Sequence, residues 1–141
     1  MRKMLIGLAW TMAVAAPAGA APDAAEQAQF ESFVVAAGAS NGAARSCGAS
    51  EPDLAQHQAT SRANLERYAK EYGFSAAGYD GLYRKGLADG ARMMEEMKRS
   101  GVDGCRGVLD SFQNERGSSY EEMKAALAEV SDGLPGESAE K

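Results

Sequence analysis

Histidine is almost absent from the sequence, since His57 is the single one among 141 residues. Structural and catalytic zinc sites commonly use three or four histidine, cysteine or carboxylate ligands. Asp53 precedes His57 by four positions, so one helix face would carry both side chains, but no second histidine completes a site. We therefore expect no metal site and no cofactor, and we expect His57 to be solvated on a polar helix face.

A catalytic triad is equally hard to assemble from these residues. The segment GASNG, residues 38–42, has the G-x-S-x-G spacing of a nucleophile elbow, with Ser40 in the nucleophile position. That motif needs a strand, a turn and a helix to expose the serine, whereas the residues before it have helical spacing. The match is typical of an alanine- and glycine-rich linker. The sequence predicts a protein that is not an enzyme.

Only two cysteines are present, Cys47 and Cys105, and neither lies in a C-x-x-C pair. The absence of this pair argues against a redox catalyst, and the absence of C-x-x-C-H excludes a covalently attached c-type haem. An even number of cysteines in an exported protein favours a disulfide. We predict an intramolecular bond between Cys47 and Cys105; an intermolecular disulfide and free thiols are the alternatives.

The sequence has no apolar run of the length that crosses a membrane, which is about 20 residues. The run Leu5–Ala16 has twelve residues, follows Arg2 and Lys3, and precedes an A-x-A sequence at residues 18–20. This order is typical of a secretory signal peptide. We predict that residues 1–20 are cleaved and that the mature chain is periplasmic or secreted, without membrane insertion.

Positive charge is in the minority. The chain has 15 Lys and Arg against 20 Asp and Glu, and Arg2 and Lys3 would leave with the signal peptide, so the mature charge is 13 − 20 = −7. An acidic chain without a basic stripe argues against nucleic acid and against anionic membrane surfaces as partners.

Valine and isoleucine are scarce after residue 20, and no segment alternates with a period of two. Alanine, glutamate, arginine and leucine dominate instead, which favours helices. We predict an all-α fold in one domain, residues 21–132, followed by a flexible polar tail at 133–141. The domain would be a small bundle of four to five amphipathic helices with antiparallel neighbours, linked by one disulfide.

Residues that start and stop helices divide the domain into segments. Asp23, Ser50 and Ser75 are expected N-caps, and Gly38 and Gly73 are expected stops. Overlapping capping boxes precede the last helix. The predicted helices cover about residues 24–37, 51–72, 76–100, 105–115 and 120–132.

Two glycines, Gly86 and Gly90, interrupt the third predicted helix, where each costs roughly 1 kcal/mol relative to alanine. They lie on the same apolar row as Tyr83 and Met94, whereas Gly81 lies off it. We predict a site of close helix packing at Gly86 and Gly90, with the second helix as the partner.

Tyrosines are concentrated around the turn between the second and third helices, and methionines at the end of the third. Tyrosine is enriched at protein interfaces, and methionine-rich faces can adapt to partners. The alternative is that these side chains fill the core of the bundle. The candidate interaction surface consists of Tyr68, Tyr72, Tyr79, Tyr83, Met93, Met94 and Met97.

Two functions fit these features. The first is a small exported, non-enzymatic protein that acts by protein–protein interaction on an unknown partner, in the manner of an inhibitor, an immunity protein or a chaperone. The alternative is a periplasmic carrier with a small-ligand pocket between helices. A carrier needs an enclosed pocket of roughly 300 Å³ or more, whereas an interaction protein needs an exposed apolar patch.

Overall fold

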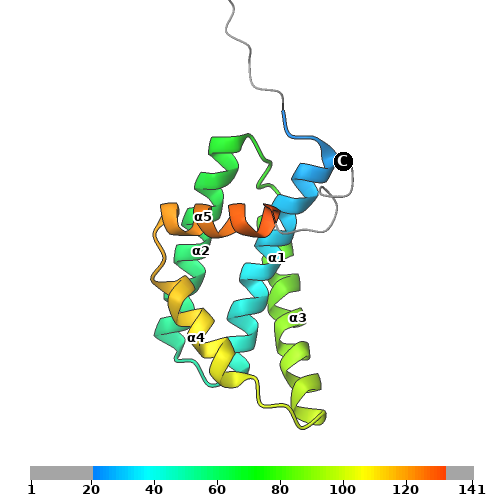
Figure 1. Cartoon of the computed structure of the whole chain (residues 1–141), viewed down its shortest axis with the longest axis vertical. Helices are drawn as coiled ribbons and strands as arrows, with labels where there is room; N and C mark the ends of the chain where they lie inside the picture. Colours follow the sequence, from blue (N-terminus) through cyan, green and yellow to red (C-terminus); the bar gives the residue numbers. More distant parts are fainter. Residues whose placement is uncertain (1–20, 133–141) are drawn as a thin grey trace, which may run out of the picture.

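The computed structural model describes residues 21–132, and all regular elements in this range are helices (Figure 1). They are α1 (Ala24–Ser46), α2 (Glu51–Tyr72), α3 (Tyr79–Arg99), α4 (Cys105–Arg116) and α5 (Tyr120–Asp132). The prediction of an all-α bundle with one disulfide is confirmed. The predicted signal peptide and polar tail lie outside the described residues.

The predicted caps explain where three helices begin. Asp23 accepts a hydrogen bond from the Glu26 amide while the Glu26 side chain accepts one from the Asp23 amide, a complete capping box at α1. Ser50 caps α2 through the Asp53 amide. Ser119 caps α5 in the same way: its hydroxyl accepts from the Glu122 amide, and the Glu122 carboxylate accepts from the Ser119 amide. These short-range signals act within one turn of chain.

Two predicted helix boundaries are wrong. The first helix does not stop at Gly38 but continues to Ser46, because Gly38 keeps a helical backbone and faces another helix. The third helix begins at Tyr79 and not after Ser75. The Ser75 hydroxyl instead accepts from the Ala77 amide, in a short turn that precedes the helix.

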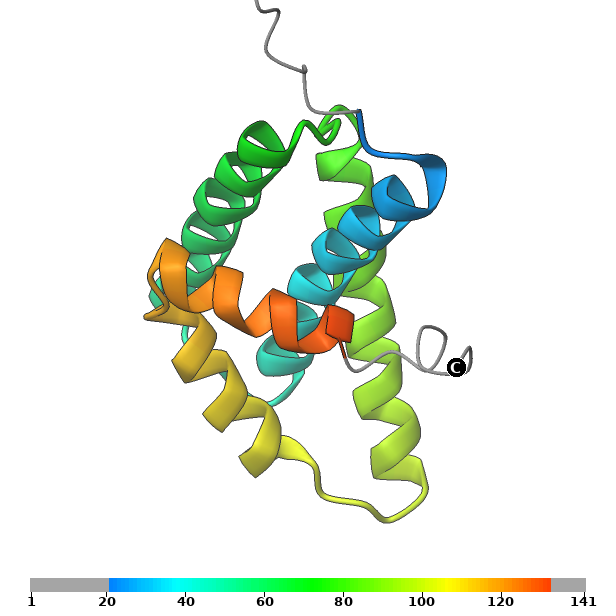
Figure 2. The ribbon, with the colours of Figure 1, turned by 45° about the horizontal axis from the view of Figure 1, so that its top comes forward.

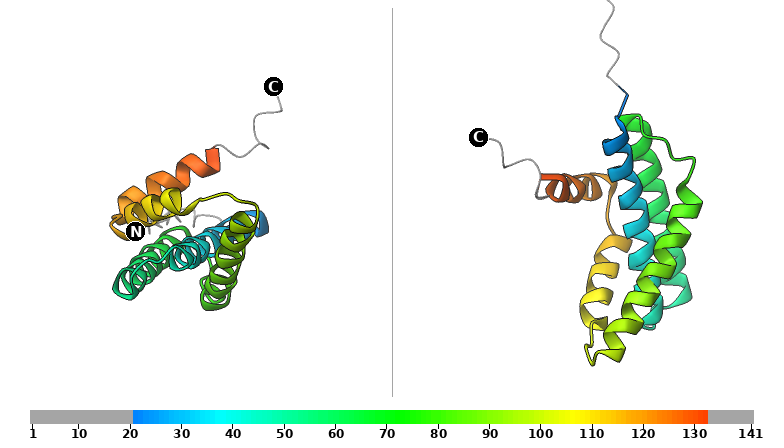
Figure 3. Two further views of the ribbon diagram at one scale, coloured as in Figure 1. Left: turned by 90° about the horizontal axis from the view of Figure 1, so that it is seen from below. Right: turned by 90° about the vertical axis from the view of Figure 1, so that its right-hand side faces the viewer.

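The long helix α1 lies at the centre of the bundle (Figure 1). It packs against α2 on one side and much more extensively against α3 on the other. Figure 3 shows these three helices as one layer, with α4 and α5 on the same side of it. Figure 2 shows α5 running crosswise over α1 and α2, and α4 inclined to both of them.

The close packing at Gly86 and Gly90 joins α3 to α1, so the prediction of α2 as the partner helix is wrong. A Cβ atom on Gly86 would lie 2.1 Å from the Val35 carbonyl oxygen, and one on Gly90 would lie 2.1 Å from that of Ala39. Real Cβ atoms do not approach a backbone oxygen so closely, so both positions require glycine. Gly81 has nothing within 4 Å of such an atom, in keeping with its place off the row.

Helix α1 supplies two further glycines to the same contact. A Cβ atom on Gly38 would lie 2.2 Å from the Tyr83 carbonyl oxygen, and one on Gly42 would lie 2.2 Å from that of Leu87. The GASNG segment is therefore a helix-packing motif and not a nucleophile elbow. Higher residue numbers on α1 meet higher numbers on α3, so these two helices are parallel. The expectation of antiparallel neighbours holds for α1 and α2 but not for α1 and α3.

The disulfide joins the end of α1 to the start of α4. Cys47 and Cys105 have their Cα atoms 5.3 Å apart, within the usual range for a disulfide. Beside it, Phe112 of α4 packs in a small buried cluster with Ala44 and Leu54. The bond and this cluster together hold α4 against α1 and α2.

Candidate functional site

The predicted tyrosine and methionine surface is not one surface. Tyr79, Tyr83 and Met94 are buried, so these three residues are wrong as members of an interface. Tyr79 and Tyr83 belong to the main hydrophobic cluster because they share the row of α3 that faces α1. Tyr68 and Met97 are half-buried.

Only two members of the predicted set are exposed, Tyr72 at 43% and Met93 at 46%. Tyr72 is the last residue of α2, at the end of the bundle where α3 begins, whereas Met93 lies near the other end of α3. These two side chains therefore point to no common site.

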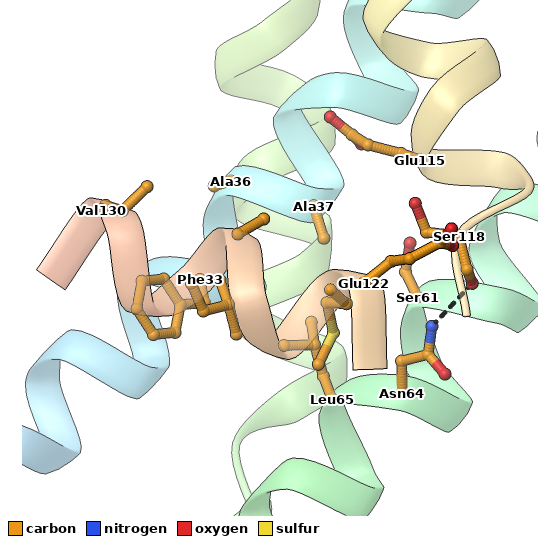
Figure 4. A pocket seen from close by; sticks show the side chains of 13 residues that line it. Phe33, Ala36, Ala37, Ser61, Asn64, Leu65, Glu115, Ser118, Glu122 and Val130 are labelled. Carbon is orange, nitrogen blue, oxygen red and sulfur yellow. Dashed lines mark hydrogen bonds between the residues drawn. The ribbon is translucent and has the colours of Figure 1, made fainter. Parts of the chain in front are cut away.

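A groove between α5 and the layer below it is the better candidate site (Figure 4). Its volume is about 300 Å³, and its walls come from α1, α2, α5 and the end of α4. Most of its lining is apolar. The lining residues are Phe33, Ala36, Ala37, Ser61, Asn64, Leu65, Glu115, Ser118, Glu122, Met123, Ala126, Leu127 and Val130.

The groove is open to solvent along one side. Ala36 of α1 and Ala126 of α5 are exposed, and so is Val130, by 53%. The apolar side chains below them are buried or half-buried: Phe33, Ala37, Leu65, Met123 and Leu127. A partner could therefore reach an apolar floor without any movement of the bundle.

A polar cluster fixes the start of α5 beside the groove. Lys124 donates a 2.6 Å hydrogen bond to Glu71 of α2, and the Tyr120 hydroxyl donates another to the same carboxylate. These two hydrogen bonds hold the pKa of the Glu71 carboxyl below its ordinary value. At the other end of α5, Ser131 bonds to Gln29 of α1 at 3.0 Å. The crosswise position of α5 is thus fixed at both ends.

One end of the groove is polar and carries two carboxylates. We call it the polar end, and it consists of Ser61, Asn64, Glu115, Ser118 and Glu122. Asn64 donates to the Ser118 carbonyl oxygen at 3.2 Å. This bond ties the turn between α4 and α5 to α2, so α2 and the turn hold the polar end in place.

Behind the polar end, His57 is completely buried at 0% exposure, so the expectation of a solvated histidine is wrong. Its Nε2 atom lies 2.8 Å from Glu115 Oε2, and its Nδ1 atom lies 3.1 Å from Asn41 Nδ2. The Asn41 amide nitrogen can only donate, and it also donates to the Leu54 carbonyl oxygen at 3.0 Å. Nδ1 is therefore the acceptor, and Nε2–H donates to Glu115.

This chain of hydrogen bonds positions a carboxylate and contains no nucleophile. Its first member is an amide, Asn41, and its last, Glu115, lines the groove. Ser40 lies within α1, and Asp53, four positions before His57, is paired with Arg116 at 2.8 Å. Within residues 21–132 no three His, Cys, Asp or Glu side chains are grouped as metal ligands.

None of the helices in residues 21–132 combines the length and the apolar composition that membrane crossing requires. Comparisons with protein-family models, with curated proteins and with solved structures found no match to this chain. The groove and its lining residues are therefore the main structural guide to function.

The sequence contained part of the signal for this groove. Met123 and Leu127 are four positions apart in the last helix, a spacing that places two apolar residues on one face, and both line the groove. The crossing of α5 over α1 and α2 was not visible, because it depends on contacts between residues far apart in the chain. Glu115 and His57 were missed as a pair for the same reason, since 58 positions separate them.

Proposed function

We propose that this protein is a small exported, non-enzymatic binding module that recognises a protein partner through the groove beneath α5. The observation that carries the proposal is an apolar groove that stays open along its exposed rim, including Ala36 and Ala126. Solvent-accessible apolar grooves of this kind commonly take side chains of a partner segment. Recognition of this kind would suit an inhibitor, an immunity protein or a chaperone-like protein.

Export and the absence of catalysis belong to the same proposal. A disulfide persists in oxidising compartments outside the cytosol, and Cys47 and Cys105 form one. The single histidine is enclosed by Asn41 and Glu115, with both ring nitrogens occupied. It is therefore in no position to act as a general base on a substrate.

Photo-crosslinking tests the groove as the recognition site. A benzophenone amino acid would replace Ala36 or Ala126 at the rim, and Ala88 on the outer face of α3 serves as the control, since all three side chains are exposed. We expect a crosslinked protein from the two rim positions and none from Ala88. The captured partner would then be purified and its Kd measured.

A variant at the rim links the captured partner to the groove. Ala126→Arg adds bulk and charge at an exposed position and should weaken the purified complex at least tenfold, while Ala88→Arg leaves it unchanged. Equal crosslinking at all three positions, or a complex that tolerates Ala126→Arg, would contradict the proposal.

A small-ligand carrier is the second candidate, because a groove of about 300 Å³ is as large as the smaller ligand pockets of proteins. Native mass spectrometry of the protein purified from its own cells distinguishes the two. A tightly bound small molecule, lost from Ala126→Arg, would favour the carrier.

A further inference from the structure

The polar end of the groove carries two carboxylates, and no cationic side chain lines the groove. We propose that it selects a cationic group, so that the partner segment presents a lysine or arginine flanked by apolar side chains. This inference rests on the proposed function and names the chemistry of the partner at that site.

The two carboxylates have unused acceptor capacity. Glu115 accepts from His57 through Oε2 only, and Glu122 accepts from the Ser119 amide through Oε2 only. No hydrogen bond to either Oε1 atom is found within residues 21–132. Charge-assisted hydrogen bonds from an ammonium or a guanidinium group to such oxygens are among the stronger ones in proteins.

Ser61 adds a hydroxyl to the polar end. Its side chain lines the groove although the residue is only 9% exposed. Its hydroxyl has no hydrogen-bond partner in the described part of the chain, and Figure 4 shows it directed toward Ser118 and Glu122. The hydroxyl is therefore free to pair with a group bound in the groove.

The protein does not neutralise these carboxylates with its own cations. No lysine or arginine lines the groove. The nearby Arg116 pairs with Asp53 at 2.8 Å, and Lys124 pairs with Glu71 at 2.6 Å. Arg67 lies over the Tyr120 ring at 3.9 Å. An incoming cation therefore meets negative charge that no basic side chain of the lining offsets.

The apolar part of the groove favours a cation that is attached to, or flanked by, apolar groups. Phe33, Leu65 and Leu127 lie beyond the carboxylates and would contact the aliphatic stem of a lysine or arginine, or a neighbouring apolar side chain. Long basic side chains commonly place their methylene groups on apolar surface in this way.

Three small probes with the same six-carbon chain separate charge from apolar contact: hexylammonium, hexanol and hexanoate. Each would be titrated into the folded mature protein while the amide and methyl signals of the groove are followed by NMR. We expect hexylammonium to bind at least tenfold more tightly than hexanol at low salt and hexanoate to bind most weakly. The advantage of hexylammonium should shrink in 0.5 M NaCl because salt screens exposed charges.

Variants assign the preference to the polar end. Glu115→Gln and Glu122→Gln should each lower the affinity for hexylammonium toward that of hexanol. Glu129→Gln is the matched control, since Glu129 is an exposed carboxylate of α5 outside the groove. The Glu129→Gln variant should bind hexylammonium with the same affinity as the unaltered protein.

Equal binding of hexylammonium and hexanol overturns the cation preference and leaves the apolar groove, and with it the proposed function, in place. Loss of hexylammonium binding in Glu129→Gln as large as in Glu122→Gln overturns the assignment to the polar end. The crosslinking experiment decides separately whether the groove is the recognition site.

Discussion

The Cα atom of Gly38 on α1 lies 2.9 Å from the position that a Cβ atom would occupy on Gly86 of α3. No side chain fits between the two helices at this level. Gly42 and Gly90 repeat the arrangement one turn further on, again against backbone atoms of the opposite helix. The two parallel helices are thus in direct backbone contact through two G-x-x-x-G segments.

Replacement of Gly86 should destabilise the fold more than an ordinary helix substitution. Even Gly86→Ala puts a methyl group 2.1 Å from the Val35 carbonyl oxygen, so α1 and α3 must separate. Overpacked substitutions commonly cost 1–3 kcal/mol, and we expect a loss of about 3 kcal/mol or more in the free energy of unfolding, larger still for Gly86→Leu. Urea denaturation measures it.

Gly81→Ala is the control for that measurement, because nothing lies within 4 Å of a Cβ atom there. Since alanine is the better helix former, this change should stabilise the protein by roughly 0.5–1 kcal/mol. Similar losses at Gly81 and Gly86 would contradict the backbone contact.

The helices themselves were predictable because their signals are local. Asp23, Ser50 and Ser119 cap their helices within one turn, and the left-handed Gly73, with φ of 79°, ends α2 as expected. The row of Gly86 and Gly90 was also readable, since helical spacing alone places both on one face. These features require no knowledge of which helices touch.

The pairing of the helices was not predictable by the same reasoning. A short turn suggested α2 as the neighbour of α3, whereas four glycines match α3 to α1. The G-x-x-x-G spacing of Gly38 and Gly42 was in the sequence and would have indicated this, but Gly38 was interpreted as a helix stop. Polar neighbours on α2 suggest a solvated His57, whereas Asn41 of α1 and Phe112 and Glu115 of α4 enclose its ring.

Removal of the disulfide should lower stability substantially. Cys47 and Cys105 are 58 positions apart, and a bond that closes a loop of this length is worth about 4 kcal/mol by chain entropy. We expect the variant Cys47→Ala with Cys105→Ala to lose most of this amount in urea denaturation. Non-reduced mass spectrometry of the mature protein should show two protons fewer than the free-thiol mass. Equal stability of the two proteins would remove the disulfide as a main contributor.

The hydrogen bonds of His57 determine which ring nitrogen carries the proton. Nδ1 faces an amide donor of Asn41 at 3.1 Å, so the proton of the neutral ring must be on Nε2. Long-range ¹H–¹⁵N spectra should show an unprotonated Nδ1 and a protonated Nε2. A ring protonated on Nδ1 alone would refute the assigned direction of both hydrogen bonds.

Replacement of Asn41 should lower the free energy of unfolding, because Asn41 is the hydrogen-bond donor to His57 Nδ1. Asn41→Ala leaves the His57 Nδ1 atom without its donor in a fully buried place, and an unsatisfied buried group costs about 1–3 kcal/mol. The exposed Asn114 is the control, and Asn114→Ala should change the free energy of unfolding by less than about 0.5 kcal/mol. Comparable effects of the two changes would mean that the buried hydrogen bonds contribute little.

Tyr83 makes stability depend on alkaline pH. Burial raises the pKa of Tyr83 to about 12, whereas an unfolded tyrosine ionises near 10. Below pH 10 both states hold the proton, so this residue causes no change there. Between pH 10 and 12 only the unfolded state releases it, and the free energy of unfolding should fall by about 1.4 kcal/mol per pH unit from this residue. The loss is complete once the pH passes the folded pKa.

Tyr83→Phe tests this account. The Tyr83 hydroxyl is buried and has no hydrogen-bond partner among residues 21–132, so its removal should leave stability at pH 7 unchanged or slightly higher. Between pH 10 and 11 the variant should lose about 1 kcal/mol less than the unaltered protein. Tyr72→Phe is the control, since it removes a tyrosine hydroxyl from a side chain that is 43% exposed. If Tyr83→Phe and the unaltered protein lose stability in parallel above pH 10, the Tyr83 hydroxyl must ionise as readily in the folded protein as in the unfolded chain.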